Sequence, residues 1–375
     1  MIPLTRPYFD QDEISEIKKV LDSGWVSQGP KVKEFEENFA KYLGIKYAVA
    51  VSNCTAALHL ALLALGVKKG DEVLVADYTF PATGHSVLYC GAKPIFVDVD
   101  PKTYNINPDK IEKIITRLSA QRRKKLKAVI PVHTFGQPAD MDPIMVIAKK
   151  YGLKVVEDAA CAAGAKYKGK MAGTIGDIGC FSFHARKGIA TGEGGMVVTN
   201  HKALADEVRL RAIFGMISGK PKKQSFGITI PRFIKLGYNY KMSDITAAVG
   251  VAQLRKIDQI VQRKRELAKY WDKKLQEISF IKSPFVDKNI FHVYQSYVTL
   301  VDRKINRNKL MKYLKDNDIQ TQIGTYASHI QPVYRSKQKC PASLDIFNRA
   351  LALSMYYTLK EEDIDKIIFC LKKYL

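Results

Sequence analysis

The sequence predicts an α/β protein built on a mainly parallel sheet with helices on its faces. Short apolar runs with high β propensity alternate with segments of helical spacing through the first half of the chain. Parallel strands need a helix-sized crossover between them, so this alternation is typical of a parallel, helix-covered sheet. A chain of 375 residues with 46% hydrophobic residues is long enough for one large and one smaller domain. The predicted strands of the sheet are residues 48–51, 73–76, 95–97, 128–132 and 153–156.

Two helices are predicted before the first strand. Asp10 is placed to cap the first helix and Gly24 to end it, while Pro30 and Gly44 bracket the second. The apolar residues at helical spacing are Ile14, Ile17 and Leu21 in the first helix and Val32, Phe35, Phe39 and Leu43 in the second. Each helix is therefore expected to carry an apolar face.

A third helix is expected directly after the strand 48–51. The polar stretch 52–57 leads into a helix-forming run over residues 58–65, and Thr55 is the predicted N-cap. The first amides of a helix have no partner within the helix and attract phosphate groups. A further helix is predicted over residues 144–151.

The character of the chain changes from about residue 260, and residues 1–255 are predicted as the large domain and residues 256–375 as the small one. The second part begins with a lysine-rich helix, followed by a β-prone run at 292–301 and a helix at 306–313. Its last helix has a capping-box pattern at Thr358 and Glu361 and one apolar face. That face consists of Ile364, Ile367, Ile368 and Leu371. The N-terminal residues are expected to pack on the small domain.

The composition of the chain limits which partners and which kinds of site are expected. The formal net charge of +23 favours anionic partners such as nucleotide diphosphates, nucleic acid or membrane surfaces. The densest basic runs, 122–125 and Lys220, Lys222 and Lys223, are expected in solvated loops and lack the interleaved aromatic residues of a nucleic-acid surface. Six scattered cysteines and dispersed histidines predict buried thiols and no metal site. The N-terminal residues lack a signal-peptide pattern, so a cytoplasmic protein without membrane association is expected.

The stretch 179–199 carries the strongest functional signal. Two β-prone segments, 180–183 and 196–199, enclose a polar, glycine-rich loop that contains Lys187. Loops at the strand ends of α/β sheets collect catalytic residues, and a lysine held there can act as a Schiff-base nucleophile. A lone lysine is more often a solvated surface residue, so the surrounding pattern decides between these interpretations.

That pattern resembles the active-site segment of the DegT-type sugar aminotransferases, which are fold-type I pyridoxal phosphate (PLP) enzymes. The matching residues are Gly-Cys-Phe-Ser-Phe-His at 179–184, Lys187, and Thr-Gly-Glu-Gly-Gly-Met-Val-Val-Thr at 191–199. The resemblance implies a large PLP-binding domain with a seven-stranded sheet and a smaller C-terminal α+β domain. Related dehydratases carry histidine at the lysine position, so Lys187 implies transamination.

The resemblance also assigns roles to side chains in several loops. Lys187 would bind PLP covalently, Asp158 would pair with the ring nitrogen, and Phe80 would lie over the ring. The remaining implied cofactor contacts are Thr55, Ala56, Cys161, Ser182 and Asn239. Asn239 would reach the cofactor from the partner subunit of a homodimer. Many relatives have glutamine or histidine at the position of Cys161.

The implied reaction transfers an amino group from glutamate or glutamine to a keto group of a nucleotide-diphosphate sugar, which gives an amino sugar for surface polysaccharide, glycan or secondary-metabolite synthesis. His184 and His329 are candidate substrate contacts, although a structural role fits His329 equally well. A keto-cyclitol aminotransferase of the scyllo-inosose type would have the same cofactor motifs. The net charge also suggests the alternative hypothesis of a regulatory or nucleic-acid-binding protein on a PLP fold. The intact lysine, aspartate and phosphate site argues against this alternative.

Overall fold

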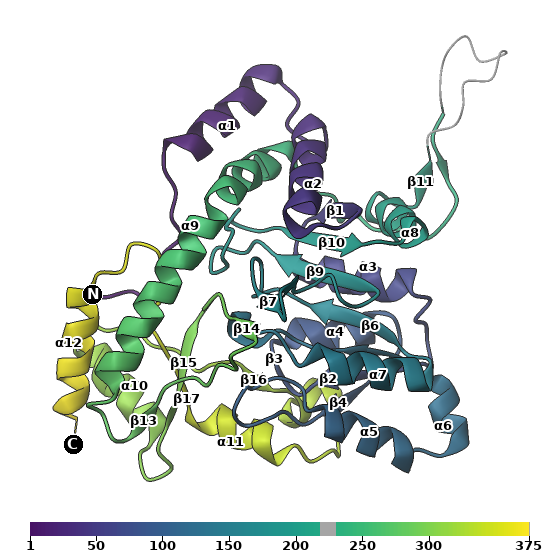
Figure 1. The fold of residues 1–375 in the computed structure, drawn as a ribbon. Coiled ribbons are helices and arrows are strands. Elements are labelled where there is room, and N and C mark those ends of the chain that lie inside the picture. The colour runs from purple at the N-terminus through teal and green to yellow at the C-terminus, as the bar shows by residue number, and fades with distance from the viewer. Residues whose placement is uncertain (218–229, 375) are drawn as a thin grey trace.

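The computed structural model describes residues 1–217 and 230–374, and its centre is a seven-stranded sheet (Figure 1). Five neighbouring strands, from β4 to β9 in the sheet, run parallel, whereas β10 is antiparallel to both of its neighbours. In spatial order the strands are β4 (Lys93–Val97), β2 (Glu72–Ala76), β5 (Leu126–Ile130), β6 (Lys154–Asp158), β9 (Ile178–Ser182), β10 (Gly195–Thr199) and β1 (Tyr47–Val51). The predicted α/β class and mainly parallel sheet are confirmed.

Helices cover both faces of this sheet. Side chains alternate between the two faces along each strand, so Val73 and Val75 pack in one apolar cluster and Leu74 and Ala76 in another. The first face is covered by α3 (Cys54–Ala64), α4 (Pro81–Tyr89) and α8 (Lys202–Ala212). The second is covered by α2 (Pro30–Leu43), α5 (Pro108–Arg117), α7 (Met141–Tyr151) and the first part of α9 (Asp244–Leu275).

The helix α1 (Gln11–Ser23) begins and ends at the predicted residues, with a capping box at Asp10 and Gly24 in the left-handed conformation. Its expected apolar face does not enter the core. Ile14 and Leu21 are 59% and 56% exposed, and the helix instead buries Glu13, Glu16 and Val20. The reason is an ion-pair network with α9, described below, which turns the acidic side of α1 inward.

The helix α9 runs without a break from the large sheet to the C-terminal part of the chain (Figure 1). The predicted boundary at residues 255–256 falls inside it. Beyond α9, a three-stranded antiparallel sheet packs with the terminal helices around a separate apolar cluster. This region contains β13 (Ile281–Lys282), β15 (Tyr297–Val301), β17 (Ala350–Leu353), α10 (Arg307–Asp316), α11 (Pro341–Arg349) and α12 (Glu361–Lys372).

Two short pairings tie the C-terminal part to other segments. The strand β16 (Tyr326–Ala327) pairs with β3 (Tyr78–Thr79) beside the large sheet, and Ile2 forms a parallel bridge with Ile319. The apolar face of α12 is buried as predicted, but the capping box at Thr358 and Glu361 is wrong. Lys360 is the N-cap residue of α12 and makes no side-chain capping bond.

The remaining short elements include two small sheets. One contains β7 (Lys166–Tyr167), β8 (Lys170–Met171) and β14 (Ile290–Phe291), and the other contains β11 (Met216–Ile217) and β12 (Arg232–Phe233). The basic run 122–125 lies in a short exposed helix, α6 (Ala120–Lys125), rather than in a loop. The predicted run at Lys220, Lys222 and Lys223 lies outside the described residues. Within residues 1–217 and 230–374, no helix combines the length and apolar character needed to span a membrane.

Candidate active site

Asp158 is the last residue of β6, at the carboxyl edge of the sheet, as the sequence predicted. It is nearly fully buried and accepts hydrogen bonds from the Thr83 hydroxyl at 2.8 Å and the Ala160 amide at 3.1 Å. Burial raises the pKa of the Asp158 carboxyl above its usual value, while those two donors and the charge of Lys187 act in the opposite direction. A cation placed against this carboxylate would therefore be strongly favoured.

Lys187 lies in the loop that follows β9, the strand beside β6. The loop is closed by backbone bonds from Ala185 N to Gly192 O at 3.0 Å and from Lys187 N to His184 O at 2.8 Å. The Lys187 Nζ atom donates to the Cys161 Sγ atom at 3.1 Å. Burial by itself lowers the pKa of Lys187, but electrostatic interactions with Cys161, Cys54 and Asp158 and the hydrogen bond to Cys161 raise it overall. The structure thus brings Lys187 and Cys161 into contact near Asp158.

The start of α3 lies beside the same edge, but its cap differs from the prediction. Asn53, not Thr55, is the N-cap residue, because its side chain accepts from the Ala56 amide at 2.8 Å and the helix already begins at Cys54. Thr55 therefore sits within the first turn. An anion bound here would contact the amides of the first turn and would compete with Asn53 for the Ala56 amide.

Gly195 explains how the phosphate-binding residues implied by the sequence come together. It pairs with Ser182 across β10 and β9, and a Cβ atom on Gly195 would lie 2.5 Å from the backbone carbon of Asn53. Only a residue without a side chain lets the start of α3 approach β10 so closely. Ser182 and the first turn of α3 are therefore neighbours across Gly195.

Sequence reasoning missed two polar residues of this site, Thr83 and Lys264. Thr83 lies in the first turn of α4 and reaches Asp158 although 75 positions separate them. Lys264 lies on α9 and is only 5% exposed. Burial and the charge of Lys187 lower the pKa of Lys264 to about 8, while Cys161 acts in the opposite direction. The position of Thr83, a polar residue at the start of a helix, could have indicated a role in the site. The lysine-rich sequence around Lys264 gave no indication that this lysine is buried.

Phe80 and Asn239 are both exposed. Phe80 is the N-cap residue of α4, is 65% exposed, and has its ring centroid 6.2 Å from that of Tyr326. Asn239 accepts a hydrogen bond from the Lys241 Nζ atom. Its neighbour Tyr240 accepts from the Ser52 amide at 2.7 Å, directly before the cap of α3. Asn239 is therefore held at the surface by a segment anchored next to α3.

The two candidate substrate histidines lie in different settings. The His184 side chain is 44% exposed and its Nε2 atom lies 3.8 Å from a Glu193 oxygen. His329 is buried, and Asp77 at the end of β2 accepts from both its backbone amide at 2.6 Å and its Nδ1 atom at 2.7 Å. These bonds favour the structural interpretation of His329, because they pin the segment after β16 to the sheet.

The donor atoms of Asp77, His329 and Cys340 lie within 4.8 Å of one another. Burial is the main cause that raises the pKa of the Cys340 thiol, and the hydrogen bond to Asp77 adds to it. A neutral thiol that donates to a carboxylate satisfies this cluster without a metal ion.

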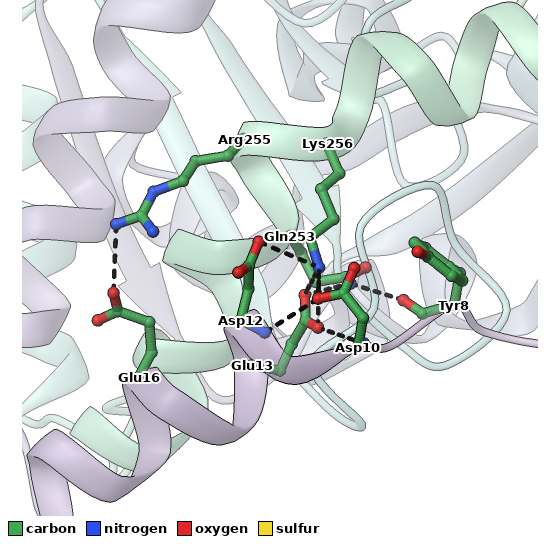
Figure 2. A network of polar contacts seen from close by, with 8 residues as sticks. All are labelled: Tyr8, Asp10, Asp12, Glu13, Glu16, Gln253, Arg255 and Lys256. Atoms are coloured by element: carbon green, nitrogen blue, oxygen red, sulfur yellow. Dashed lines mark hydrogen bonds and ion pairs between the residues drawn. The ribbon is translucent and has the colours of Figure 1, made fainter.

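A polar network joins the N-terminal segment to α9 (Figure 2). The Gln253 amide nitrogen donates to the Tyr8 carbonyl and to Glu13, both at 2.8 Å, and its oxygen accepts from the Ala190 amide at 3.3 Å. Lys256 donates to Asp10 and to both Glu13 oxygens. The lysine loop is thereby connected to the first helix through one glutamine side chain.

Comparison with known proteins identifies the family. The DegT/DnrJ/EryC1/StrS aminotransferase family profile matches residues 7–372. The chain belongs to this aminotransferase family. GDP-perosamine synthase of Escherichia coli O157:H7 is 40% identical over 365 residues, which cover 97% of this chain and 95% of that protein. The Bacillus subtilis spore coat polysaccharide biosynthesis protein SpsC is 38% identical, with 98% of this chain and 95% of SpsC covered.

A solved structure of the same architecture contains the cofactor. The PLP form of the putative sugar aminotransferase Spr1654 from Streptococcus pneumoniae superposes with a TM-score of 0.90 at 26% identity. The alignment covers 100% of this chain and 99% of Spr1654. This DegT-family chain is therefore a PLP-dependent aminotransferase of fold type I.

The residues at the candidate site fit PLP. Asp158 offers a buried carboxylate to a cationic ring nitrogen, Lys187 offers an amine, and the first turn of α3 offers amides to a phosphate. When bound, PLP supplies a ring that withdraws electrons from the carbon that loses its proton. The thiol of Cys161 contacts the lysine amine at this site.

Proposed function

We propose that this aminotransferase moves an amino group from glutamate, or glutamine, to a keto group of a nucleotide-diphosphate sugar. The observation that carries the proposal is the Lys187 amine, 3.1 Å from Cys161, in the loop beside the strand that ends at Asp158. The relationship to GDP-perosamine synthase supports a nucleotide-linked sugar as acceptor. The net charge of +23 would attract its diphosphate.

Lys187 has two proposed tasks. Its amine holds the cofactor covalently in the resting enzyme, and after release the same amine moves a proton at the substrate carbon. Asp158 keeps the ring nitrogen protonated, because a buried carboxylate with two hydrogen-bond donors favours a cationic neighbour. The exposed face of Phe80 is available to stack on the ring.

The phosphate is proposed to lie at the start of α3, held by the amides of Thr55 and Ala56, the Thr55 hydroxyl and Ser182. Helix N-termini favour anions because their first amides have no partner within the helix and carry partial positive charge. Cys161, where many relatives have glutamine or histidine, is proposed to lie beside the cofactor. His184 is proposed to face the substrate from the exposed side of the lysine loop.

The active unit is proposed to be a homodimer in which Asn239 of one subunit reaches the phosphate bound by the other. Asn239 is exposed in the single chain, as such a contact requires. Ile14, Leu21 and Trp25 expose 56% to 59% of their surface, and a second copy would remove these apolar side chains from water. We also propose that the enzyme works in the cytoplasm, where nucleotide sugars are made.

The function can be tested by incubating purified enzyme with glutamate and a panel of nucleotide-linked keto sugars, and with keto-cyclitols in parallel. The proposal predicts 2-oxoglutarate and an aminated sugar nucleotide. Amination of a keto-cyclitol alone would replace the proposed acceptor while leaving the roles of Lys187 and Asp158 intact. Salt-sensitive DNA binding without any transamination would contradict the proposed function.

A further inference from the structure

Cys161 and Lys187 form a thiol and amine pair in direct contact. The Sγ and Nζ atoms are 3.1 Å apart, and both residues are half-buried rather than sealed in the core. A thiol of this kind is reached by small solutes and has a nitrogen nucleophile beside it. An accessible thiol beside a nitrogen nucleophile is what is needed for an oxidised sulfur to form a sulfur–nitrogen bond.

The other cysteines differ in setting. Cys54, Cys90, Cys180 and Cys340 are buried. Burial is the main cause that raises the pKa of each of these four thiols. A buried thiol with a raised pKa rarely forms the reactive thiolate. Cys370 on α12 is half-buried like Cys161 and serves as an internal comparison.

Two lysines lie close to Cys161. Lys187 donates to its sulfur, and the electrostatic influence of Cys161 extends to Lys264 on α9, which is buried. The thiolate, and not the thiol, is the form of a cysteine that reacts with oxidants. Cys161 therefore differs from the four buried cysteines in being partly accessible and in having an amine at contact distance.

We propose that Cys161 and Lys187 are a redox-sensitive cross-linking site, at which hydrogen peroxide joins the two side chains as a sulfenamide. In the first step the Cys161 thiolate attacks peroxide: a sulfur–oxygen bond forms, the oxygen–oxygen bond breaks, and the leaving hydroxide takes a proton to give water. Sulfur is oxidised by two electrons and peroxide is reduced.

In the second step the unprotonated Lys187 amine attacks the sulfenic acid. A nitrogen–sulfur bond forms, the sulfur–oxygen bond breaks, and hydroxide leaves with the amine proton as a second water molecule. The thiol and the amine each lose one hydrogen, and a dithiol reductant reverses the bond. The cross-link and the cofactor would compete for the same amine, so the link would form in protein whose Lys187 carries no PLP and would block cofactor binding until it is reduced.

The test is mass mapping of full-length protein exposed to hydrogen peroxide, once after its PLP has been removed and once after PLP has been added back. The expected product without PLP is a peptide pair joined through Cys161 and Lys187, two hydrogen atoms lighter than the separate peptides and lost after dithiothreitol. Added PLP should protect, because it competes for the same amine. The readout is a mass, so it succeeds or fails independently of the proposed amino transfer.

Three variants separate the cross-link from other oxidation. Cys161→Ser should lose the linked pair, whereas Cys370→Ser should retain it. Lys187→Arg should leave Cys161 as a sulfenic acid that dimedone traps. The proposal is overturned if wild-type protein forms sulfinic acid at Cys161 with no link to Lys187, or if Cys370 oxidises while Cys161 stays reduced.

Discussion

The Thr83 hydroxyl donates a 2.8 Å hydrogen bond to one carboxylate oxygen of Asp158. The other carboxylate oxygen accepts from the Ala160 amide at 3.1 Å. The two donors come from different parts of the chain, one from α4 and one from the residues directly after β6. Both stabilise the ionised carboxylate against burial, which raises its pKa.

Replacing Thr83 with valine should raise the pKa of Asp158. A hydrogen bond to a charged group contributes about 1.5 to 3 kcal/mol, so losing the Thr83 bond should make the ionised form of Asp158 less stable. The acid limb of the pH profile for the half-reaction with glutamate should therefore move to higher pH. Absorbance of the bound cofactor in a stopped-flow instrument would follow this half-reaction.

Two variants control that experiment. Thr83→Ser keeps the hydroxyl and should keep the wild-type profile. Asp158→Asn removes the titrating group and should slow the half-reaction by orders of magnitude while binding PLP nearly normally. An unchanged profile in Thr83→Val would mean that another group produces the acid limb.

Lys264 should reduce stability at neutral pH. Its pKa falls from the usual value near 10.5 to about 8 in the folded chain. The unfolded chain holds the proton between these values, so stability rises as pH increases from about 8 to about 10.5. Lys264→Met should therefore stabilise cofactor-free protein by up to about 3 kcal/mol at pH 7, and the difference should vanish above pH ~10.5. Chemical denaturation at several pH values measures this difference.

The ion pairs that Lys256 makes with Asp10 and Glu13 should persist to low pH. The hydrogen bond from Lys256 is the main cause that lowers the pKa of Asp10 to about 2. Stability from a lowered carboxyl pKa is present above the unfolded value and is lost as pH falls through the folded value. Lys256→Met removes this contribution, so residues 8–13 should already be less protected above pH ~4 and should lose less further protection between about pH 4 and about 2 than in the wild type. Hydrogen exchange of this segment would measure this protection.

At neutral pH the same variant leaves Glu13 buried without its cation, which should cost about 3 kcal/mol of stability. Lys18→Met is the matched control, because the Lys18–Asp22 pair lies on the same helix with 71% and 63% of its side chains exposed. It should change stability by only about 0.3 to 0.5 kcal/mol. Equal effects of the two variants would contradict the role given to Lys256.

Asn239 can be tested by complementation between two inactive variants. In a mixed dimer of Asn239→Ala and Lys187→Ala, one site carries both defects, whereas the other keeps its own Lys187 and receives the partner's intact asparagine. That site should be active. Loss of a hydrogen bond to phosphate costs about 1.5 to 3 kcal/mol, so Asn239→Ala alone should retain PLP poorly. Activity no higher than the sum of the parent variants, after proven subunit exchange at limiting PLP, would refute the trans contact.

Local patterns predicted much of this structure. The strand order along the chain, the ends of α1 and α2, the position of Asp158 at a strand end and the Lys187 loop all depend on residues close in sequence. Thr55 was predicted as a cap because threonine suits that role, but Asn53 starts the helix earlier. Two residues able to cap a helix that lie only two positions apart cannot be told apart without the backbone geometry.

Long-range contacts account for the other differences between the predicted and the observed structure. The exposure of Ile14 and Leu21 follows from the pairing of Glu13 with Lys256, 243 positions away. The roles of Thr83 and Lys264 could not be predicted for the same reason, because their neighbours in the site come from strands and loops that are distant in sequence. A lysine-rich helix gives no indication in sequence of which lysine it buries.

The central claim is that Lys187 is the lysine that holds PLP, and a second buried lysine makes this claim testable. Lys264 is 5% exposed, with a pKa lowered to about 8, so it is a credible competitor for the aldehyde. The direct measurement is borohydride reduction of PLP-loaded enzyme followed by peptide mass mapping. The cofactor mass should lie on Lys187, and Lys187→Ala should lose both the adduct and the yellow colour while Lys264→Met keeps them. An adduct on Lys264 in the wild-type enzyme would contradict the assignment.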